Sequence, residues 1–370
     1  RVTMPRTLDE RIVIVDIDEK SLGRVGQWPW RRDKMAALVR ELFERQQVSV
    51  VGFDVLFAEA DESSGLSTLQ ELAQGPLRSQ PAFQEQLKRL APSLDFDALF
   101  AQSLRGRPVV LGYYLSGEDR DGITKGMLPD PALPLERLRG LPLGATTWRG
   151  YSSNIEALTR AAPAAGFFNS ITDEDGVVRS LPLLAEYQGQ YYESLALAMF
   201  RTAIGLPEIH PGFVNPTPVG THDLLQSIVL RQDGRTLALP VDQQLATLIP
   251  YRGPGDAKGG SFRYISASDV LDGVLPPGQL KDQLVLVGST APGLLDLRVT
   301  PVGRTYPGVE THANVLSAFL DGKSIVRPDY AAGFDVLQLL CAGLLLAVAL
   351  PLLSASSAVL LSAGVVSALV

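Results

Sequence analysis

The chain has 370 residues, of which 46% are hydrophobic, enough to bury the core of one large domain or two average ones. Its formal net charge is −7 and its basic residues are scattered singly, which excludes the basic stripe that nucleic acid binding requires. The only cysteine, Cys341, excludes an internal disulfide or a cysteine metal site elsewhere in the chain.

Two short apolar runs near the N-terminus, residues 11–17 and 48–53, predict strands that are buried on both faces. A loop and then a run of apolar residues at helical spacing separate them, which predicts an amphipathic helix from Arg31 to about Gln46. This order predicts a right-handed crossover whose two strands pair in parallel. Residues 28–30 (Trp-Pro-Trp) are interpreted as a hydrophobic staple, with a membrane-surface or dimer contact as the alternative.

The middle of the chain alternates polar segments with further signals of regular structure. Residues 59–107 and 116–153 are expected to be excursions from the core, the second an insertion or lid. Short helices are predicted at 84–90, 95–104, 192–204 and 266–271, strands at 108–115, 246–250 and 283–287, hairpins at 166–184 and 227–239, and a final helix with one apolar face at 307–320. The predicted fold class is α/β, with a mixed, mostly parallel sheet flanked by helices and extended by β-hairpins.

The C-terminal 35 residues, 336–370, carry no charged side chain. A membrane helix is expected over residues 332–353, because that stretch is long and apolar enough to cross a bilayer. Apolar residues resume after Pro351 and a run of serines, so residues 356–370 are expected to begin a second membrane helix that is truncated here. Membrane lipid is therefore an expected partner, and a further span upstream of Arg1 is expected.

Carboxylates follow the two predicted N-terminal strands. Asp16 and Asp18 lie two residues apart, so their side chains should project from the same face. Ligands in open α/β sheets gather beyond the carboxyl ends of strands, which predicts one crevice lined by Asp16, Asp18, Asp54, Ser289 and Thr290. Structural ties between strand ends and loops are the favoured interpretation. A polar ligand pocket and a Mg²⁺ or Ca²⁺ site on the three aspartates are the alternatives.

His312 lies on the apolar face of the last predicted helix, where a buried histidine bonded to the backbone is the favoured interpretation. The alternative is a base or ligand that Asp296 or Glu310 orients. The other two histidines lie in loops, so the sequence shows no three-histidine zinc cluster; they are His210 and His222.

Residues 172–176 (Thr-Asp-Glu-Asp-Gly) resemble part of a calcium loop but lack its further ligands, and we interpret them as a hairpin turn. Arg179 is expected to pair with Asp173 or Asp175. Residues 288–291 (Gly-Ser-Thr-Ala) lack the lysine and the glycine spacing of a phosphate loop. These patterns predict no catalytic residue.

Five segments together resemble the CHASE2 family of bacterial sensor domains, in that family's order and roughly its spacing. They are VDIDEKSLGRVGQWPWRR (15–32), VVGFDVLF (50–57), GFFNSITDEDGVVRSLPL (166–183), LVLVGSTAPGLLDLRVTP (284–301) and YPGVETHANVL (306–316). The similarity spans about residues 11–327. The combination of motifs is far more specific than any one of them.

The resemblance implies a periplasmic sensory domain, residues 1–328, in the cell inner membrane, preceded by one span and typically followed by three. It implies a cytoplasmic output enzyme, absent from this chain, with an adenylate cyclase expected first and a histidine or Ser/Thr kinase as the alternative. The expected signal is an unknown small molecule or ion, and the expected assembly a homodimer. Two other functions stay open, a structural assembly protein and a membrane-anchored hydrolase using Asp16, Asp18, Asp54 and His312.

Overall fold

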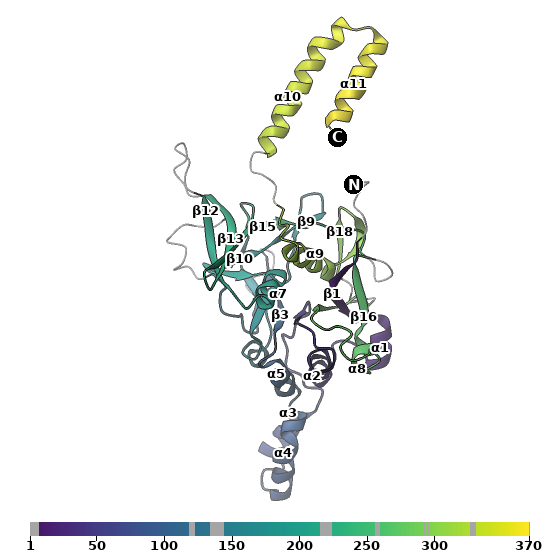
Figure 1. Cartoon of the computed structure of the whole chain (residues 1–370). Helices are drawn as coiled ribbons and strands as arrows, with labels where there is room; N and C mark the ends of the chain where they lie inside the picture. Colours follow the sequence, from purple (N-terminus) through teal and green to yellow (C-terminus); the bar gives the residue numbers. More distant parts are fainter. Residues whose placement is uncertain are drawn as a thin grey trace. The chain divides into compact units, whose positions relative to one another are not determined.

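A computed structural model describes most of the chain, namely residues 7–117, 123–133, 144–214, 224–255, 260–291, 293–294, 296–325 and 331–369. The chain separates into two compact units, residues 1–325 and 326–370. The first is an α/β domain and the second consists of apolar helices (Figure 1).

The first unit is built on an eight-stranded sheet, in which the strand order is β16-β1-β17-β2-β3-β6-β4 and β7 also pairs with β3. Its strands are β1 (Asp9–Asp16), β2 (Val50–Phe53), β3 (Val109–Ser116), β4 (Thr124–Lys125), β6 (Gly150–Ser152), β7 (Ala164–Phe167), β16 (Phe262–Ser266) and β17 (Leu284–Gly288). All neighbouring pairs are parallel except β3 and β6. The mixed, mostly parallel sheet that the sequence predicts is confirmed.

The predicted direct pairing of β1 with β2 is wrong. The two strands are parallel, but β17 lies between them and pairs with both: Val285 is in register with Val13 on one side and with Val51 on the other. The reason is that β17 is buried at every position, which is typical of a strand with a neighbour on each side. Because β17 comes much later in the sequence than β2, the order of elements near the N-terminus does not reveal it.

Helices cover both faces of the sheet, and β1 shows how the sequence produces this. Ile12 and Ile14 belong to the core cluster that contains residues of α7 and α9, whereas Val13 and Val15 belong to the cluster that contains residues of α2, α5 and α8. The result is a three-layer domain (Figure 1). The helix bounds are α2 (Arg32–Arg40), extended by a π-helical turn (Glu41–Arg45), α5 (Phe96–Leu104), α7 (Leu195–Ala203), α8 (Ala267–Leu271) and α9 (Gly308–Leu320).

The segment before α2 contains a helix, α1 (Glu19–Val25), where the sequence pattern indicates a loop. This helix has only seven residues, too few for an apolar periodicity to show. Trp30 is buried in the same core cluster as Met35, as a hydrophobic staple requires, and Trp28 packs edge-on against Trp30.

The segment 59–107, expected to be an excursion, contains three helices, α3 (Leu66–Gln74), α4 (Pro81–Leu94) and α5. No residue of α4 is buried. In contrast, α5 packs on α2, and Phe100 makes edge-to-face contacts with Phe53 and Phe57. The last part of the segment therefore belongs to the core.

The predicted hairpins form small sheets of their own instead of extending the central sheet. They lie in β15-β9-β8 and β12-β13-β14, and two further small sheets that the sequence did not predict are β11-β10-β5 and the pair β18-β19. The turn at 173–176 joins β8 to β9, and Arg179 pairs with both Asp173 and Asp175 at 2.6 Å, which confirms the hairpin turn. The remaining bounds are β5 (Thr147–Trp148), α6 (Glu156–Thr159), β8 (Ile171–Thr172), β9 (Val178–Pro182), β10 (Leu184–Tyr187), β11 (Gln190–Glu193), β12 (Glu208–Val214), β13 (Leu224–Gln232), β14 (Arg235–Pro240), β15 (Ala246–Leu248), β18 (Leu297–Thr300) and β19 (Gly303–Pro307).

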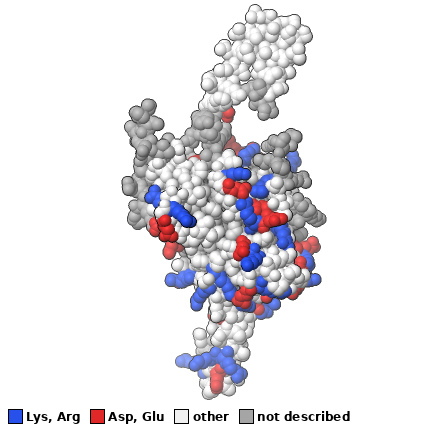
Figure 2. Space-filling view, viewed as in Figure 1, with Lys and Arg blue, Asp and Glu red and all other residues white. Residues whose placement is uncertain are grey.

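The second unit contains α10 (Ala331–Ala349), a 3₁₀ turn (Leu350–Leu352) and α11 (Ala355–Leu369). Within the described residues, one helix is long and apolar enough to cross a membrane, Gly333–Leu352, with a mean hydropathy of 2.1 and none of its window buried. The apolar part of α11 is shorter, Ala355–Ser367, and does not meet that length. Both helices are almost entirely free of charged side chains in Figure 2, whereas acidic and basic side chains intermix on the first unit.

Close packing between β2 and β3 requires a glycine at position 112. A Cβ atom there would lie 2.2 Å from the carbonyl oxygen of Phe53 and 2.9 Å from the ring of Phe168. We expect Gly112→Ala to lower the free energy of unfolding by about 2 kcal/mol, because the two strands must move apart. Denaturant unfolding of the detergent-solubilised chain measures this.

The matched control is Gly23→Ala, on the exposed side of α1, where a Cβ atom meets nothing within 4 Å. It should stabilise the protein by up to about 1 kcal/mol through the higher helix propensity of alanine. Equal effects of the two substitutions would contradict the packing described for β2 and β3.

Candidate functional site

The carboxyl ends of β1, β17 and β2 lie side by side at one edge of the central sheet. The predicted site residues are found there, since β1 ends in Asp16, Ser289 and Thr290 follow β17, and Asp54 follows β2. Their hydrogen bonds and charged neighbours, however, place them in separate groups.

Asp16 is 3% exposed and binds the loop after β17. Its carboxylate accepts a hydrogen bond from the backbone N–H of Thr290 at 2.8 Å and another from the hydroxyl of the same residue. Ser289 in turn donates to the carbonyl oxygen of Ile17 at 2.9 Å. Burial raises the pKa of Asp16 to about 6, although the hydrogen bonds from Thr290 oppose the shift.

Asp18 caps the N-terminus of α1, where its carboxylate accepts a hydrogen bond from the backbone N–H of Ser21 at 2.8 Å. The same oxygen accepts from the hydroxyl of Ser266 at 2.8 Å. Ser266 occupies the N-cap position of α8, as predicted, but its hydroxyl makes no capping bond there. Asp18 therefore joins α1 to the end of β16.

Asp54 lies near a different group, formed by Asp296 and Arg298. Burial raises the pKa of the Asp54 carboxyl to about 7; Asp296 adds to the shift and Arg298 opposes it. Asp296 pairs with Arg298 at 2.8 Å, and its carbonyl oxygen accepts from the N–H of Gly308, the first residue of α9, at 2.8 Å. This group connects the end of β2 electrostatically with the start of α9.

His312 is 1% exposed, its ring lies beside the backbone of Phe168, and its Nδ1 atom has no hydrogen-bond partner among the described residues. Burial lowers its pKa to about 4, so the imidazole is neutral at physiological pH. This is the buried histidine that the sequence pattern favours. Glu310, one of its two expected carboxylate partners, instead accepts a hydrogen bond from the hydroxyl of Tyr264 at 2.6 Å.

Within the described part of the chain, no three histidine, cysteine, aspartate or glutamate side chains are grouped so that they could hold a metal ion. The Mg²⁺ or Ca²⁺ interpretation of Asp16, Asp18 and Asp54 stays a prediction. His210 lies beside Glu208, with 3.3 Å between Nε2 and the carboxylate, and His222 falls outside the described residues.

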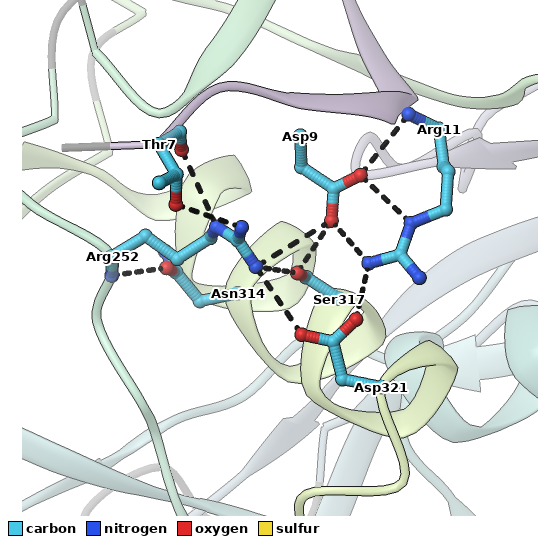
Figure 3. Close-up of polar contacts among 7 residues, drawn as sticks. All are labelled: Thr7, Asp9, Arg11, Arg252, Asn314, Ser317 and Asp321. Atoms are coloured by element: carbon cyan, nitrogen blue, oxygen red, sulfur yellow. Dashed lines mark hydrogen bonds and ion pairs between the residues drawn. The ribbon is translucent and has the colours of Figure 1, made fainter. Parts of the chain in front are cut away.

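Sequence reasoning missed a cluster of ion pairs centred on Asp9, whose side chain is 2% exposed (Figure 3). We call it the Asp9 cluster; its members are Asp9, Arg11, Arg252, Ser317 and Asp321. Asp9 accepts hydrogen bonds from the Arg11 side chain at 2.7 and 2.9 Å and from the Ser317 hydroxyl at 2.6 Å. Arg11 also donates to Asp321 at 2.7 Å.

Arg252 completes the Asp9 cluster from the loop between β15 and β16. Its guanidinium donates to the Ser317 hydroxyl at 2.8 Å and lies 3.7 Å from Asp9 and 3.5 Å from Asp321. Another of its nitrogens donates to the hydroxyl of Thr7 at 2.9 Å (Figure 3). The cluster thus joins the chain before β1 to the C-terminal half of α9.

The last residue of the first unit is also held in place. The carbonyl oxygen of Ile325 accepts hydrogen bonds from the N–H of Leu248 at 2.8 Å and from the hydroxyl of Thr247 at 3.1 Å. The first and last described residues of the α/β domain, Thr7 and Ile325, are therefore both held by specific contacts.

Comparison with protein families identifies the chain. The family model of the CHASE2 domain matches residues 1–352. The chain belongs to the CHASE2 family. No curated protein and no solved structure matches it. CHASE2 is an extracellular sensory domain of signalling receptors, and the apolar helix Gly333–Leu352 suggests that this one is anchored in a membrane.

The stability of this CHASE2 domain is expected to fall as the pH rises from about 4 to about 7. The folded state raises the pKa of Asp54 from 3.8 to about 7, so it holds that proton more tightly than the unfolded chain. The resulting stabilisation is complete below the unfolded pKa and is lost as the pH rises through the folded pKa. Asp16 acts in the same direction, with a folded pKa of about 6.

Asp54→Asn removes this titration, so at about pH 8 the variant should be more stable than the wild type by about 1–2 kcal/mol. At about pH 4 the two proteins should be equally stable. Denaturant midpoints across this pH range measure the difference. An Asp54→Asn profile parallel to that of the wild type would show that folding does not raise the pKa of this carboxyl.

Proposed function

We propose that this CHASE2 domain, placed on the periplasmic side of the inner membrane, regulates a cytoplasmic enzyme through α9, and that this enzyme is a cyclase making cyclic AMP. In support, α9 is buried from Gly308 to Phe319 by the rest of the domain. Only residues 321–332 separate its end from the apolar stretch Gly333–Leu352. A displacement of α9 therefore has a short covalent path to the membrane.

The Asp9 cluster is the observation that carries the proposal. Ser317 of α9 and Asp321, the C-cap residue of α9, are bound to Asp9 and Arg11 near the start of β1. A ligand that binds two arrangements of the domain with different affinity shifts the equilibrium between them. Because α9 and the start of β1 share these contacts, such a shift would reach the N-terminal and the C-terminal flank together. A histidine or Ser/Thr kinase output would use the same path.

The location is tested with single cysteines. Cys341→Ser removes the only native thiol, and Ser79→Cys places one on the exposed turn between α3 and α4. A membrane-impermeant maleimide should label this cysteine from outside intact spheroplasts. Labelling only after lysis would place the domain in the cytoplasm and refute the proposal.

The output is tested with the full-length protein in its native membranes, assayed for cyclic AMP formation from ATP and for phosphate incorporation into protein. Asp321→Asn weakens the Asp9 cluster at a residue whose side chain is 27% exposed, so it should change the basal output without unfolding the domain. The control is Asp272→Asn, which removes the exposed ion pair with Arg24. Phosphate incorporation would support the kinase alternative. If neither cyclic AMP nor phosphorylated protein formed, both outputs would be refuted.

A further inference from the structure

The α/β domain contains a cavity of about 720 Å³, within the size range of small-molecule sites. One wall is the segment 127–132, part of the expected insertion or lid. A second wall is the segment 159–165, which leads into β7. The third comes from β11, α7 and the start of β12. Most lining residues are proline, alanine, leucine, methionine or isoleucine, and Asp130, Arg160 and Glu208 add charged side chains.

A buried ion pair supplies the polar part of this cavity. Glu193 and Arg201 both line it, their side chains are 9% and 12% exposed, and they are hydrogen-bonded through Nη1 and Oε1. Arg201 also donates from Nε to the carbonyl oxygen of Pro207 at 2.9 Å. These two bonds fix the plane of the guanidinium within an apolar setting, where a hydrogen bond to a charged donor is strong.

Hydrogen-bonding capacity remains at this ion pair. The bonds of Arg201 described above use Nε and Nη1 and leave Nη2 for a further acceptor, and the buried Oε2 atom of Glu193 has no hydrogen-bond partner among the described residues. The hydroxyl of Tyr113 is also buried and has no hydrogen-bond partner among the described residues. Burial raises its pKa, and the nearby charge of Glu193 raises it further. A buried polar atom without a partner costs free energy, so a group that completes these bonds would be bound favourably.

We propose that this cavity is the ligand site of the sensory domain, and that its ligand is a small organic molecule with an apolar body and one amide or carboxyl group. The ligand's oxygen accepts from Nη2 of Arg201, and its apolar body fills the space between the segments 127–132 and 159–165. A primary ammonium could donate to Oε2 of Glu193 but would leave Nη2 of Arg201 without an acceptor, whereas an amide can complete both bonds.

The position of the cavity also relates it to the proposed signal path, and in this respect the inference rests on the proposed function. Arg201 follows Phe200 on α7, and the ring of Phe200 packs against that of Phe319 on α9 with 5.3 Å between centroids. A ligand that shifts α7 would therefore act directly on α9. The helix α7 thus contacts both the cavity, through Arg201, and α9, through Phe200.

The chemistry is tested with three compounds that share a six-carbon body, namely hexanoate, hexanamide and hexylamine. Thermal unfolding of the detergent-solubilised chain measures binding, since a ligand that binds the folded state raises the unfolding temperature. Hexanamide, which can complete both bonds, should stabilise the chain most, and hexylamine, which offers Nη2 no acceptor, should stabilise it least. Stabilisation by hexylamine equal to or greater than that by hexanamide, or by none of the three, would overturn the proposal.

Two variants locate the binding. Ala132→Leu fills the cavity from the segment 127–132 without touching the ion pair, and should weaken binding by about tenfold or more. Ala82→Leu, on the exposed surface of α4, is the matched control and should bind as the wild type does. Equal affinity of both variants for hexanoate and hexanamide would place the site elsewhere.

The double variant Glu193→Gln/Arg201→Gln keeps polar side chains at both positions, with a shorter one at 201, and removes both charges. It should lose affinity for hexanoate more than for hexanamide, whereas a purely structural ion pair would change neither. Unfolding without ligand reports whether the variant folds. If the ligands bind and Ala132→Leu blocks them while the membrane output is unaffected by ligand, the site stands and the proposed sensory coupling fails.

Discussion

Replacing Asp9 with alanine is expected to lower the free energy of unfolding of the CHASE2 domain by about 3 kcal/mol. The substitution removes the acceptor of the Arg11 side chain and of the Ser317 hydroxyl, and it leaves Arg252 without one of its two carboxylate neighbours. Because Asp9 is almost completely buried, water cannot replace these contacts without entering the domain. Denaturant unfolding of the detergent-solubilised chain measures the loss.

Acid should have the same effect as the substitution. Burial alone would raise the pKa of Asp9, but hydrogen bonds from Arg11 and Ser317 lower it from 3.8 to about 2. The carboxylate therefore contributes stability that is present above the unfolded pKa and is lost as the pH falls from about 4 to about 2. Asp9→Asn should lack this acid transition, which lies below the window assigned to Asp54.

The control is Asp272→Ala, which breaks an exposed ion pair with Arg24 and should cost no more than about 1 kcal/mol. If Asp9→Ala were as mild as Asp272→Ala, the Asp9 cluster would not hold α9 to β1. The mechanical part of the proposed function would then have no physical basis.

The elements of the core could be predicted because their signals are local. The strands β1, β2 and β17 are short apolar runs, and the residues of α2 recur at helical spacing, so the mostly parallel sheet follows from the sequence. The strand order does not follow. Nothing in the residue types of β1 and β2 indicates that β17 separates them, because the paired stretch of each of these strands is a similar run of buried apolar residues.

The candidate sites divide in a similar way. Asp16, Asp54 and Thr290 can be placed at one edge because each ends or follows a parallel strand. The Asp9 cluster cannot be foreseen, since Asp9 and its partner Ser317 are 308 residues apart. The ion pair of Glu193 with Arg201 is equally hidden, because a buried charged pair has the same sequence pattern as an exposed one.

Leu344→Arg is expected to remove α10 from the bilayer. The residue lies near the middle of the candidate span Gly333–Leu352, where exchanging leucine for arginine costs about 3–4 kcal/mol of insertion free energy. Cys341, the only thiol, lies on the same helix and reports the change. In native membranes a water-soluble maleimide should leave the wild-type thiol unlabelled, since hydrocarbon surrounds it, and should label it in the variant.

A control at the end of the span distinguishes loss of insertion from a general effect of the added charge. Leu353→Arg introduces the same side chain just beyond the span, where a long arginine can reach the interface, so Cys341 should stay protected. Labelling of Cys341 in the wild-type protein would mean that water reaches the middle of α10. A signal leaving α9 would then have no membrane helix to act upon, and the α/β domain would have to communicate with its output by contact alone.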